Sequence, residues 1–206
     1  MIEVKNISKS FDKKIILKNY SYSFEDNKIY CLIGESGCGK TTLLRIISGL
    51  DRPDKGEVFY NNTPIKKPSK NIFMMNQSYT NFPWKTCLEN VLFPIKLQGQ
   101  VREEHKKQAI DLLTEVGLEE SINHYPYELS GGMKQRLALA RTLMIKPEVI
   151  LMDEPLSALD PSTREKMQDM IIKLHKETQN TIIMITHDHD EAEKMGDIVL
   201  KFERSV

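Results

Sequence analysis

The sequence predicts one α/β domain with antiparallel strands near its N-terminus and a helical insertion. Short apolar runs at residues 28–34 and 148–153 are typical of buried strands, while the alternation of apolar and polar residues at 2–7 and 20–24 is typical of antiparallel strands. The intervening chain is mainly helical. We therefore expect an α/β core over residues 1–77 and 147–206, and a helical subdomain over residues 78–146.

One stretch of the helical part shows the expected periodicity clearly. Residues 102–117 place four apolar side chains on one face of a helix, namely Ala109, Leu112, Leu113 and Val116. The charged face of this helix is expected to be solvated.

Composition restricts the function classes. The chain has 206 residues, 40% of them hydrophobic, and 29 basic residues balance 29 acidic ones, so no general attraction to nucleic acid is expected. No apolar run reaches the roughly 18 residues of a membrane helix, and the N-terminus lacks a signal peptide pattern, so a cytosolic chain is expected. Cys31, Cys38 and Cys87 show no ligand spacing and are expected to be reduced thiols.

Residues 34–42, GESGCGKTT, join a predicted strand to a predicted helix and match the pattern G-x-x-x-x-G-K-[ST]. Glycines let backbone N–H groups turn towards a polyphosphate, and the helix N-terminus favours the same anion. In this P-loop, Lys40 would contact the β- and γ-phosphates and Thr41 would ligate Mg²⁺. The candidate nucleotide contacts are Gly34, Glu35, Ser36, Gly37, Cys38, Gly39, Lys40, Thr41 and Thr42.

Two alternatives apply to this loop. A glycine-rich turn without a ligand would show some of the same residues, although the strand-to-helix context favours phosphate binding. Cys38 occupies a variable position of the pattern, where a redox role is the alternative to a spectator side chain.

Residues 148–155, EVILMDEP, form an apolar run that ends in two acids, the arrangement called Walker B. Asp153 would act on the metal side, and Glu154 could polarise the attacking water. The alternative is a strand that ends in solvent-exposed acids. A P-loop in the same chain requires an acid near the metal, which favours the catalytic interpretation.

Ser130, Gly131 and Gly132 begin a second predicted helix, where bare N–H groups would form another anion site. An ordinary serine N-cap is the alternative. The helix that follows carries an expected core stripe of Met133, Leu137, Ala140 and Met144. One nucleotide needs only one P-loop, so the second site suggests a two-fold dimer in which each copy closes on its neighbour's nucleotide.

These motifs carry a resemblance to a known family. LSGGMKQ, at residues 129–135, resembles the signature of ATP-binding cassette (ABC) ATPases and precedes a Walker B strand, as in that family. The resemblance implies a P-loop NTPase core of the RecA-like type, with ATP and Mg²⁺ as ligands.

The resemblance also assigns single residues. Phe11 resembles the aromatic residue that stacks on adenine, and Gln77 the glutamine that reaches the magnesium and the attacking water. Asp160 ends a loop, residues 157–160, similar to the one that passes information across the dimer. His187 resembles the histidine that senses the γ-phosphate.

Each of these residues also has a simpler interpretation. Phe11 could be a core aromatic, Gln77 a solvated turn residue and His187 a local cap. The run HDHDE, residues 187–191, could suggest a metal cluster, but one functional histidine followed by acids at a helix N-terminus is the expectation.

The resemblance implies an ATP-hydrolysing homodimer that powers a transmembrane permease from the cytoplasmic face of the membrane, with an extracytoplasmic substrate-binding protein as an indirect partner. Trp84, with Phe82 and Phe93, is either a docking surface or a small core. Pro83-Trp84 resembles importers of nitrate, sulfonates, taurine and thiamine-precursor pyrimidines. Four residues follow DIVLKF, so no C-terminal regulatory domain is expected.

Rival functions lack their expected features. A soluble ABC ATPase that acts on DNA or ribosomes typically has two cassettes or a long coiled-coil insertion, and neither is present in the sequence. A GTPase would carry an NKxD motif, which is absent from the sequence, and a small-molecule kinase gives no reason for LSGGMKQ.

Overall fold

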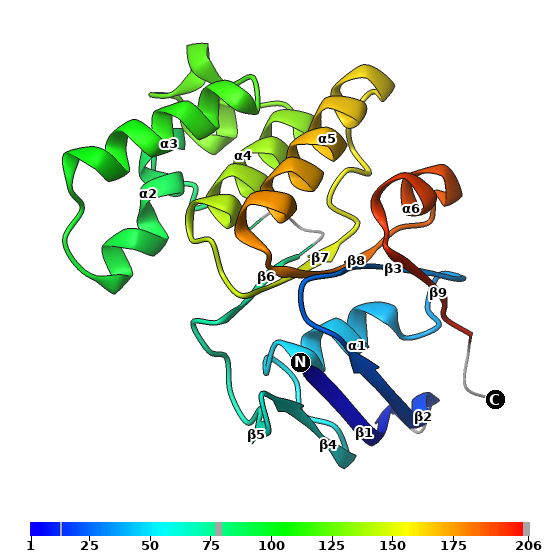
Figure 1. The fold of residues 1–206 in the computed structure, drawn as a ribbon. Coiled ribbons are helices and arrows are strands. Elements are labelled where there is room, and N and C mark those ends of the chain that lie inside the picture. The colour runs from blue at the N-terminus through cyan, green and yellow to red at the C-terminus, as the bar shows by residue number, and fades with distance from the viewer. Residues whose placement is uncertain (13, 77–79, 204–206) are drawn as a thin grey trace. The chain divides into compact units, whose positions relative to one another are not determined.

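The computed structural model describes residues 1–12, 14–76 and 80–203. The chain forms two compact units (Figure 1). The first unit comprises residues 1–74, 147–154 and 179–206, and the second comprises residues 75–146 and 155–178. The segment 155–178 thus groups with the mainly helical part of the chain.

The first unit contains an antiparallel sheet in the order β2-β1-β4-β5. Its strands are β1 (Ile2–Phe11), β2 (Lys14–Phe24), β4 (Lys55–Tyr60) and β5 (Thr63–Pro64). β1 pairs antiparallel with β2, so that Ile2 lies opposite Phe24. Both side chains are buried, because the alternation of the sequence turns one face of the sheet inwards. The two antiparallel strands predicted before the P-loop are confirmed.

The first unit also contains a sheet in the order β6-β7-β8-β3-β9. Its strands are β3 (Ile29–Ile33), β6 (Ile72–Met75), β7 (Val149–Asp153), β8 (Thr181–Ile185) and β9 (Ile198–Lys201). β7, β8, β3 and β9 run parallel to one another, and every residue of β3, β7 and β8 is buried. Continuous apolar runs suit parallel strands that are covered on both faces.

Two helices of the first unit follow strands of this sheet, α1 (Lys40–Ile47) after β3 and α6 (His189–Met195) after β8. The strand register places Leu32 and Asp153 on either side of Ile185. The carboxyl ends of β3, β7 and β8 therefore lie at one edge, which is where ligands bind in α/β sheets.

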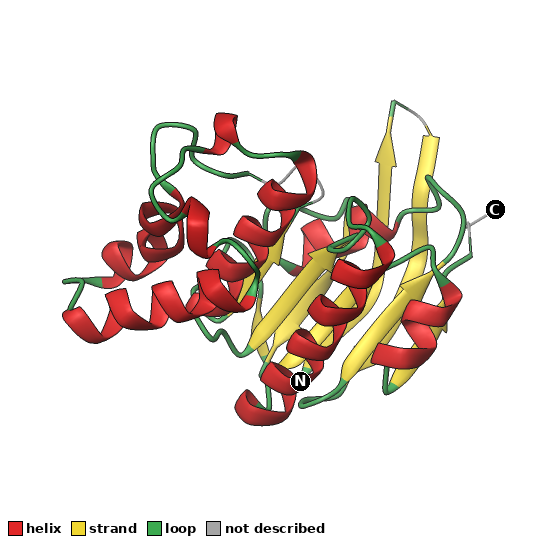
Figure 2. Cartoon of the chain, turned by 90° about the horizontal axis from the view of Figure 1, so that it is seen from above, coloured by secondary structure: helices red, strands yellow, loops and turns green. Residues whose placement is uncertain are grey.

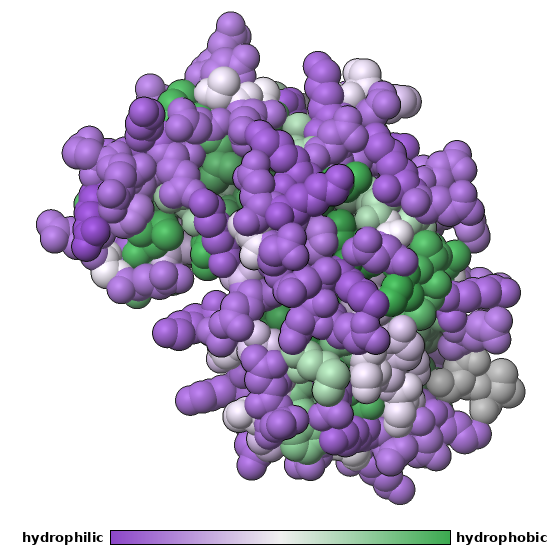
Figure 3. Space-filling view, in the orientation of Figure 1, coloured by the Kyte–Doolittle hydropathy of each residue, from purple (hydrophilic) through white to green (hydrophobic). Residues whose placement is uncertain are grey.

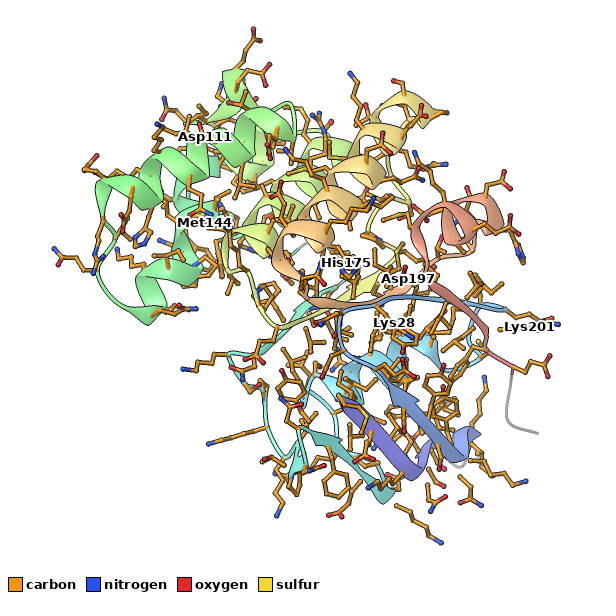
Figure 4. All side chains as sticks on the ribbon, viewed as in Figure 1. Lys28, Asp111, Met144, His175, Asp197 and Lys201 are labelled. Atoms are coloured by element: carbon orange, nitrogen blue, oxygen red, sulfur yellow. The ribbon has the colours of Figure 1, made fainter. Side chains whose placement is uncertain are left out.

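At the amino ends of the strands, Asp197 joins the start of β9 to the start of β3 (Figure 4). Its Oδ2 accepts a hydrogen bond of 2.8 Å from the backbone N–H of Ile29. Figure 4 shows Asp197 and Lys28 near each other at the starts of β9 and β3, and Lys201 at the far end of β9. This contact fixes β9 beside the strand that leads into the P-loop.

Beyond the end of β6, all regular elements in the described part of the second unit are helices (Figure 2). They are α2 (Cys87–Gln98), α3 (Glu103–Glu115), α4 (Gly131–Met144), α5 (Pro161–Thr178) and two 3₁₀ turns, η1 (Glu119–Ser121) and η2 (Pro126–Glu128). All four residues of the predicted apolar face at 102–117 are buried. That prediction is confirmed.

More residues of α4 are buried than the predicted one-sided core stripe includes. Met133 stays partly exposed, whereas the helix is buried continuously from Leu137 to Met144. Arg141 is included, because its guanidinium donates to the Thr80 carbonyl at 2.6 Å and lies over the Phe82 ring. Burial lowers the pKa of Arg141 to about 10.

Figure 3 shows mostly hydrophilic residues on the face in view. Cys31, Cys38 and Cys87 are all buried and unpaired, as predicted for reduced thiols. Within the described ranges, no helix combines the length and the apolar character needed to span a membrane.

Candidate nucleotide site

The backbone of the P-loop requires glycine at two points. A Cβ on Gly34 would lie 2.2 Å from the Phe202 carbonyl oxygen. Gly39 has φ of 111°, and a Cβ there would lie 3.0 Å from the side chains of Ile16 and Leu17. Gly39 is the N-cap of α1 and offers no side chain to the first N–H groups of that helix.

Lys40 is buried inside the loop. Its ammonium donates to the carbonyls of Gly34 at 2.7 Å and Glu35 at 2.9 Å, and it lies 3.6 Å from Cys38 Sγ. The loop therefore holds a positive charge at the N-terminus of α1, where the helix dipole adds to the attraction for an anion. Glu35, Ser36 and Gly37 are exposed beside it.

Thr41 links the P-loop to the end of β7. Its hydroxyl donates to Asp153 Oδ1 over 3.2 Å, although 112 residues separate the two along the chain. Burial raises the pKa of Asp153, and the neighbouring Glu154 adds to this, while the Thr41 hydrogen bond and Lys40 oppose it. A hydroxyl and a carboxylate oxygen this close are ligands that Mg²⁺ prefers.

Glu154 follows β7 in the left-handed region, with φ of 50°, and its N–H donates to the Ile185 carbonyl at 3.1 Å. A non-glycine residue in this conformation costs roughly 1 kcal/mol or more and is typical of functional sites. His187, which follows β8, brings its Nδ1 to 3.7 Å from Glu154 Oε1. The ends of two neighbouring strands thus place a carboxylate and an imidazole together.

A cavity of about 520 Å³ opens beside the first residues of the P-loop. It is lined by Ile33, Gly34, Glu35, His187, His189, Lys201, Phe202 and Glu203. Sequence analysis did not predict a role for Phe202 and Glu203, the lining residues that follow β9. Phe202 lies beside the P-loop because its N–H donates to the Ile33 carbonyl at 2.7 Å.

Phe11 lies at the end of β1, next to the turn into β2. It is 47% exposed, so the alternative of a core aromatic is wrong. The Lys9 ammonium lies 5.2 Å from the centre of its ring. An exposed aromatic face of this kind can stack on a base.

In the second unit, Ser130 caps its own helix, because its Oγ accepts a hydrogen bond of 3.3 Å from the Met133 N–H. A Cβ on Gly131 would meet nothing within 4 Å, whereas one on Gly132 would lie 3.3 Å from the Ala158 carbonyl oxygen. The start of α4 is therefore open at Gly131 and packed against residues 157–160 at Gly132.

Two further contacts shape the loop at 157–160. Gln135 Oε1 accepts a hydrogen bond of 3.0 Å from the Ala158 N–H, a contact that sequence analysis missed. Asp160 Oδ1 accepts from the Ser162 hydroxyl at 2.7 Å and from the Thr163 N–H at 3.1 Å. These hydrogen bonds hold the pKa of Asp160 well below its usual range.

The first unit brings together the P-loop, Asp153, Glu154 and His187. Ser130, Gly131, Gly132 and Asp160 belong to the second unit. Gln77 lies outside the described residues.

A glycine-rich loop of this pattern after β3, hydrogen-bonded through Thr41 to an acid at the end of β7, is typical of P-loop nucleotide-binding enzymes. Residues 17–157 match the family described as ABC transporter. The chain belongs to this family and is one of its ATP-binding ATPase subunits.

The relatives agree with this family. The chain is 41% identical to an uncharacterized ABC transporter ATP-binding protein of Methanocaldococcus jannaschii, covering 97% of this chain and 76% of the relative. It is 42% identical to a spermidine/putrescine import ATP-binding protein of Nitrosospira multiformis, covering 93% and 54%. It is 38% identical to a nitrate import ATP-binding protein of Synechococcus elongatus, covering 90% and 69%. The chain thus spans about half the length of the polyamine relative.

A solved structure confirms the predicted fold class. The dimeric post-hydrolysis structure of an ATP-binding cassette bound to ADP and Pi superimposes with a TM-score of 0.90 and 34% identity, covering 98% of this chain and 94% of that one. The predicted ABC family and the predicted ATPase activity are likewise confirmed.

Proposed function

We propose that this chain is the nucleotide-binding subunit of an ABC importer, and that it hydrolyses ATP to drive a membrane permease. The observation that carries the nucleotide site is the hydrogen bond between Thr41 and Asp153, which joins the P-loop to the catalytic acids at the end of β7. ATP binds along residues 34–42, where Lys40 faces the β- and γ-phosphates. Phe11 stacks on the adenine.

The chain's own residues supply the chemistry. Thr41, Asp153 and Gln77 would hold Mg²⁺, which would neutralise charge on the phosphates. Glu154 orients the attacking water and accepts its proton, a contribution of about 10²–10⁴-fold in rate. His187 contacts the γ-phosphate from the neighbouring strand end, and its position 3.7 Å from Glu154 supports this role.

Two copies close head to tail around the nucleotides. Ser130, Gly131 and Gly132 of each copy bind the γ-phosphate held by the other, and the loop ending at Asp160 lies at the same interface. The open surface at Gly131 supports a phosphate contact there. The dimeric state of the similar cassette supports a two-fold assembly.

The relatives named as import ATP-binding proteins support a transport role at the cytoplasmic face of the membrane. The docking surface for the permease includes Trp84, which is 70% exposed, so that the alternative of a buried core residue is wrong. Asn90, fully buried, holds this loop by bonding to the backbone of Phe82, Lys85 and Thr86. An aromatic side chain on a fixed loop is a typical interface anchor.

The cargo is a small solute that an extracytoplasmic binding protein delivers to the permease. Relatives are named for polyamines, glycine betaine and nitrate, and Pro83-Trp84 favours the class that carries nitrate, sulfonates, taurine or thiamine-precursor pyrimidines.

The variant Glu154→Gln tests both halves of the proposal. It keeps the hydrogen-bonding shape but loses the base, so ATP hydrolysis should fall about 10²–10⁴-fold while MgATP binding persists. Phosphate release and equilibrium binding measure the two effects. The matched control Glu193→Gln, at an exposed position of α6, should hydrolyse ATP at the wild-type rate.

The same variant, trapped with MgATP, should capture a polytopic membrane protein from native membranes. Wild-type hydrolysis by Glu154→Gln would refute the role of the base. Recovery of ribosomes, nucleic acid or soluble proteins in place of a permease would contradict transport and leave the ATPase assignment intact.

A further inference from the structure

We propose that Glu191 is a positioning residue for ATP hydrolysis, which acts by fixing the turn that carries His187. This inference rests on the proposed role of His187 at the γ-phosphate. Glu191 lies in the first turn of α6, and no motif identified in the sequence assigns it a role beyond the helix dipole.

The turn between β8 and α6 is closed by three side chains. The Thr186 hydroxyl donates to Glu191 Oε2 and accepts a hydrogen bond of 3.1 Å from the Asp188 N–H. Asp188 Oδ1 in turn accepts from the Glu191 N–H at 3.1 Å. His187 is the residue between Thr186 and Asp188, so these contacts hold its backbone on both sides.

The residues that close the turn differ in solvent exposure from the His187 side chain that the turn carries. Thr186 is 2% exposed and Glu191 is 7% exposed, whereas the side chain of His187 is 67% exposed. The Nδ1 of the exposed His187 imidazole lies 3.7 Å from Glu154 Oε1. Its position therefore depends on the backbone beneath it, and hence on the hydrogen bond between Thr186 and Glu191.

Burial of the Glu191 carboxylate near the start of the short helix α6 lowers the stability of the fold. Its second oxygen, Oε1, is buried and makes no hydrogen bond to any residue that the structure describes. A buried carboxylate oxygen without a partner costs stability, and an apolar residue would avoid that cost. Asp188 already caps α6, so the helix itself does not require Glu191. The remaining contribution of Glu191 is to hold Thr186.

The test is a double-mutant cycle between Glu191→Ala and His187→Ala, read as the kcat and KM of ATP hydrolysis. Glu191→Ala should lower kcat about 10- to 100-fold, the effect of a small misplacement of a catalytic group, with little change in KM. Glu191→Gln should restore most of the rate, because an amide oxygen still accepts from Thr186. In the His187→Ala background, Glu191→Ala should cause no further loss.

Controls separate positioning from folding. Glu193→Ala, at an exposed position of the same helix, should leave kcat unchanged. MgATP affinity and the thermal midpoint of Glu191→Ala show whether the variant is folded. If it is not folded, the kcat of Glu191→Gln tests whether an oxygen acceptor for Thr186 is sufficient for hydrolysis.

The outcomes distinguish the two proposals. Equal loss of rate in both backgrounds, or no rescue by Glu191→Gln, would overturn the inference and leave the role of His187 standing. Wild-type hydrolysis by His187→Ala would overturn the role of His187, and the inference with it.

Discussion

The helices α1 and α4 both begin at glycine-rich turns, but only α4 has a side chain that caps its first N–H groups. At α1 the N-cap is Gly39, which has no side chain, and the ammonium of Lys40 bonds to the loop carbonyls. At α4 the N-cap is Ser130, whose hydroxyl accepts from the Met133 N–H. The first helix leaves its N–H groups available, whereas the second uses its serine to cap itself.

We expect this difference to separate a primary phosphate site at α1 from a secondary one at α4. At α1 the bare N–H groups and Lys40 provide charge and donors before any ligand arrives. At α4 a phosphate contact would require the Ser130 hydroxyl to divide its hydrogen bonds between its own helix and that phosphate. We therefore expect nucleotide affinity to depend on α1, and dimer closure to depend on α4.

Among the tests of this difference between the two helices, the largest effect is expected at Lys40. Lys40→Ala should raise the dissociation constant for MgATP about 10- to 100-fold, because hydrogen bonds to charged groups contribute roughly 1.5–3 kcal/mol. Titration calorimetry on the wild type and the variant measures this change. Lys55→Ala, on the exposed surface of β4, is the matched control and should bind normally. Unchanged affinity in Lys40→Ala would break the distinction between the two helix starts.

A smaller effect is expected at Ser130. Ser130→Ala removes the cap of α4 and should lower the free energy of unfolding by about 1 kcal/mol, measured by urea denaturation. Ser130→Asp keeps a capping oxygen and should retain stability, but its negative charge should repel the partner's γ-phosphate.

The readout of the Ser130→Asp variant is ATP-dependent dimerisation in the Glu154→Gln background. Loss of the dimer with normal stability would support a phosphate contact at the start of α4. Full dimerisation would show that α4 does not contact the nucleotide.

The sequence predicts those parts of the fold and site that depend on local spacing. The pattern of residues 34–42, the acids after β7 and the alternation of β1 each lie within about ten residues, so the chemistry is visible without the fold. The family resemblance orders these motifs along the chain, and the matching cassette structure confirms the fold class.

The remaining features arise where distant segments meet. Phe202 joins the P-loop only because β9 pairs with β3, and Gln135 is paired with Ala158 from another segment. Trp84 is a different case. Its residue type fits a core as well as a surface, and only its exposure in the structure distinguishes the two. The sequence predicts Glu191 only as one of the acids at a helix N-terminus, because its residue type does not show that the side chain is buried.

The smallest predicted effect concerns the stability of the first unit without nucleotide. Burial raises the pKa of Asp153 above its unfolded value, so its ionised form destabilises the folded state near neutral pH. Asp153→Asn keeps an oxygen for Thr41 and should raise the free energy of unfolding at pH 7 by about 0.5–1 kcal/mol. This gain should shrink as the pH falls through the raised pKa and vanish below the unfolded pKa of about 4, because both states of the wild type are then protonated. Thermal denaturation between about pH 4 and about pH 7.5 measures the trend. A stability gain that grows as the pH falls would show that burial does not govern the pKa of Asp153.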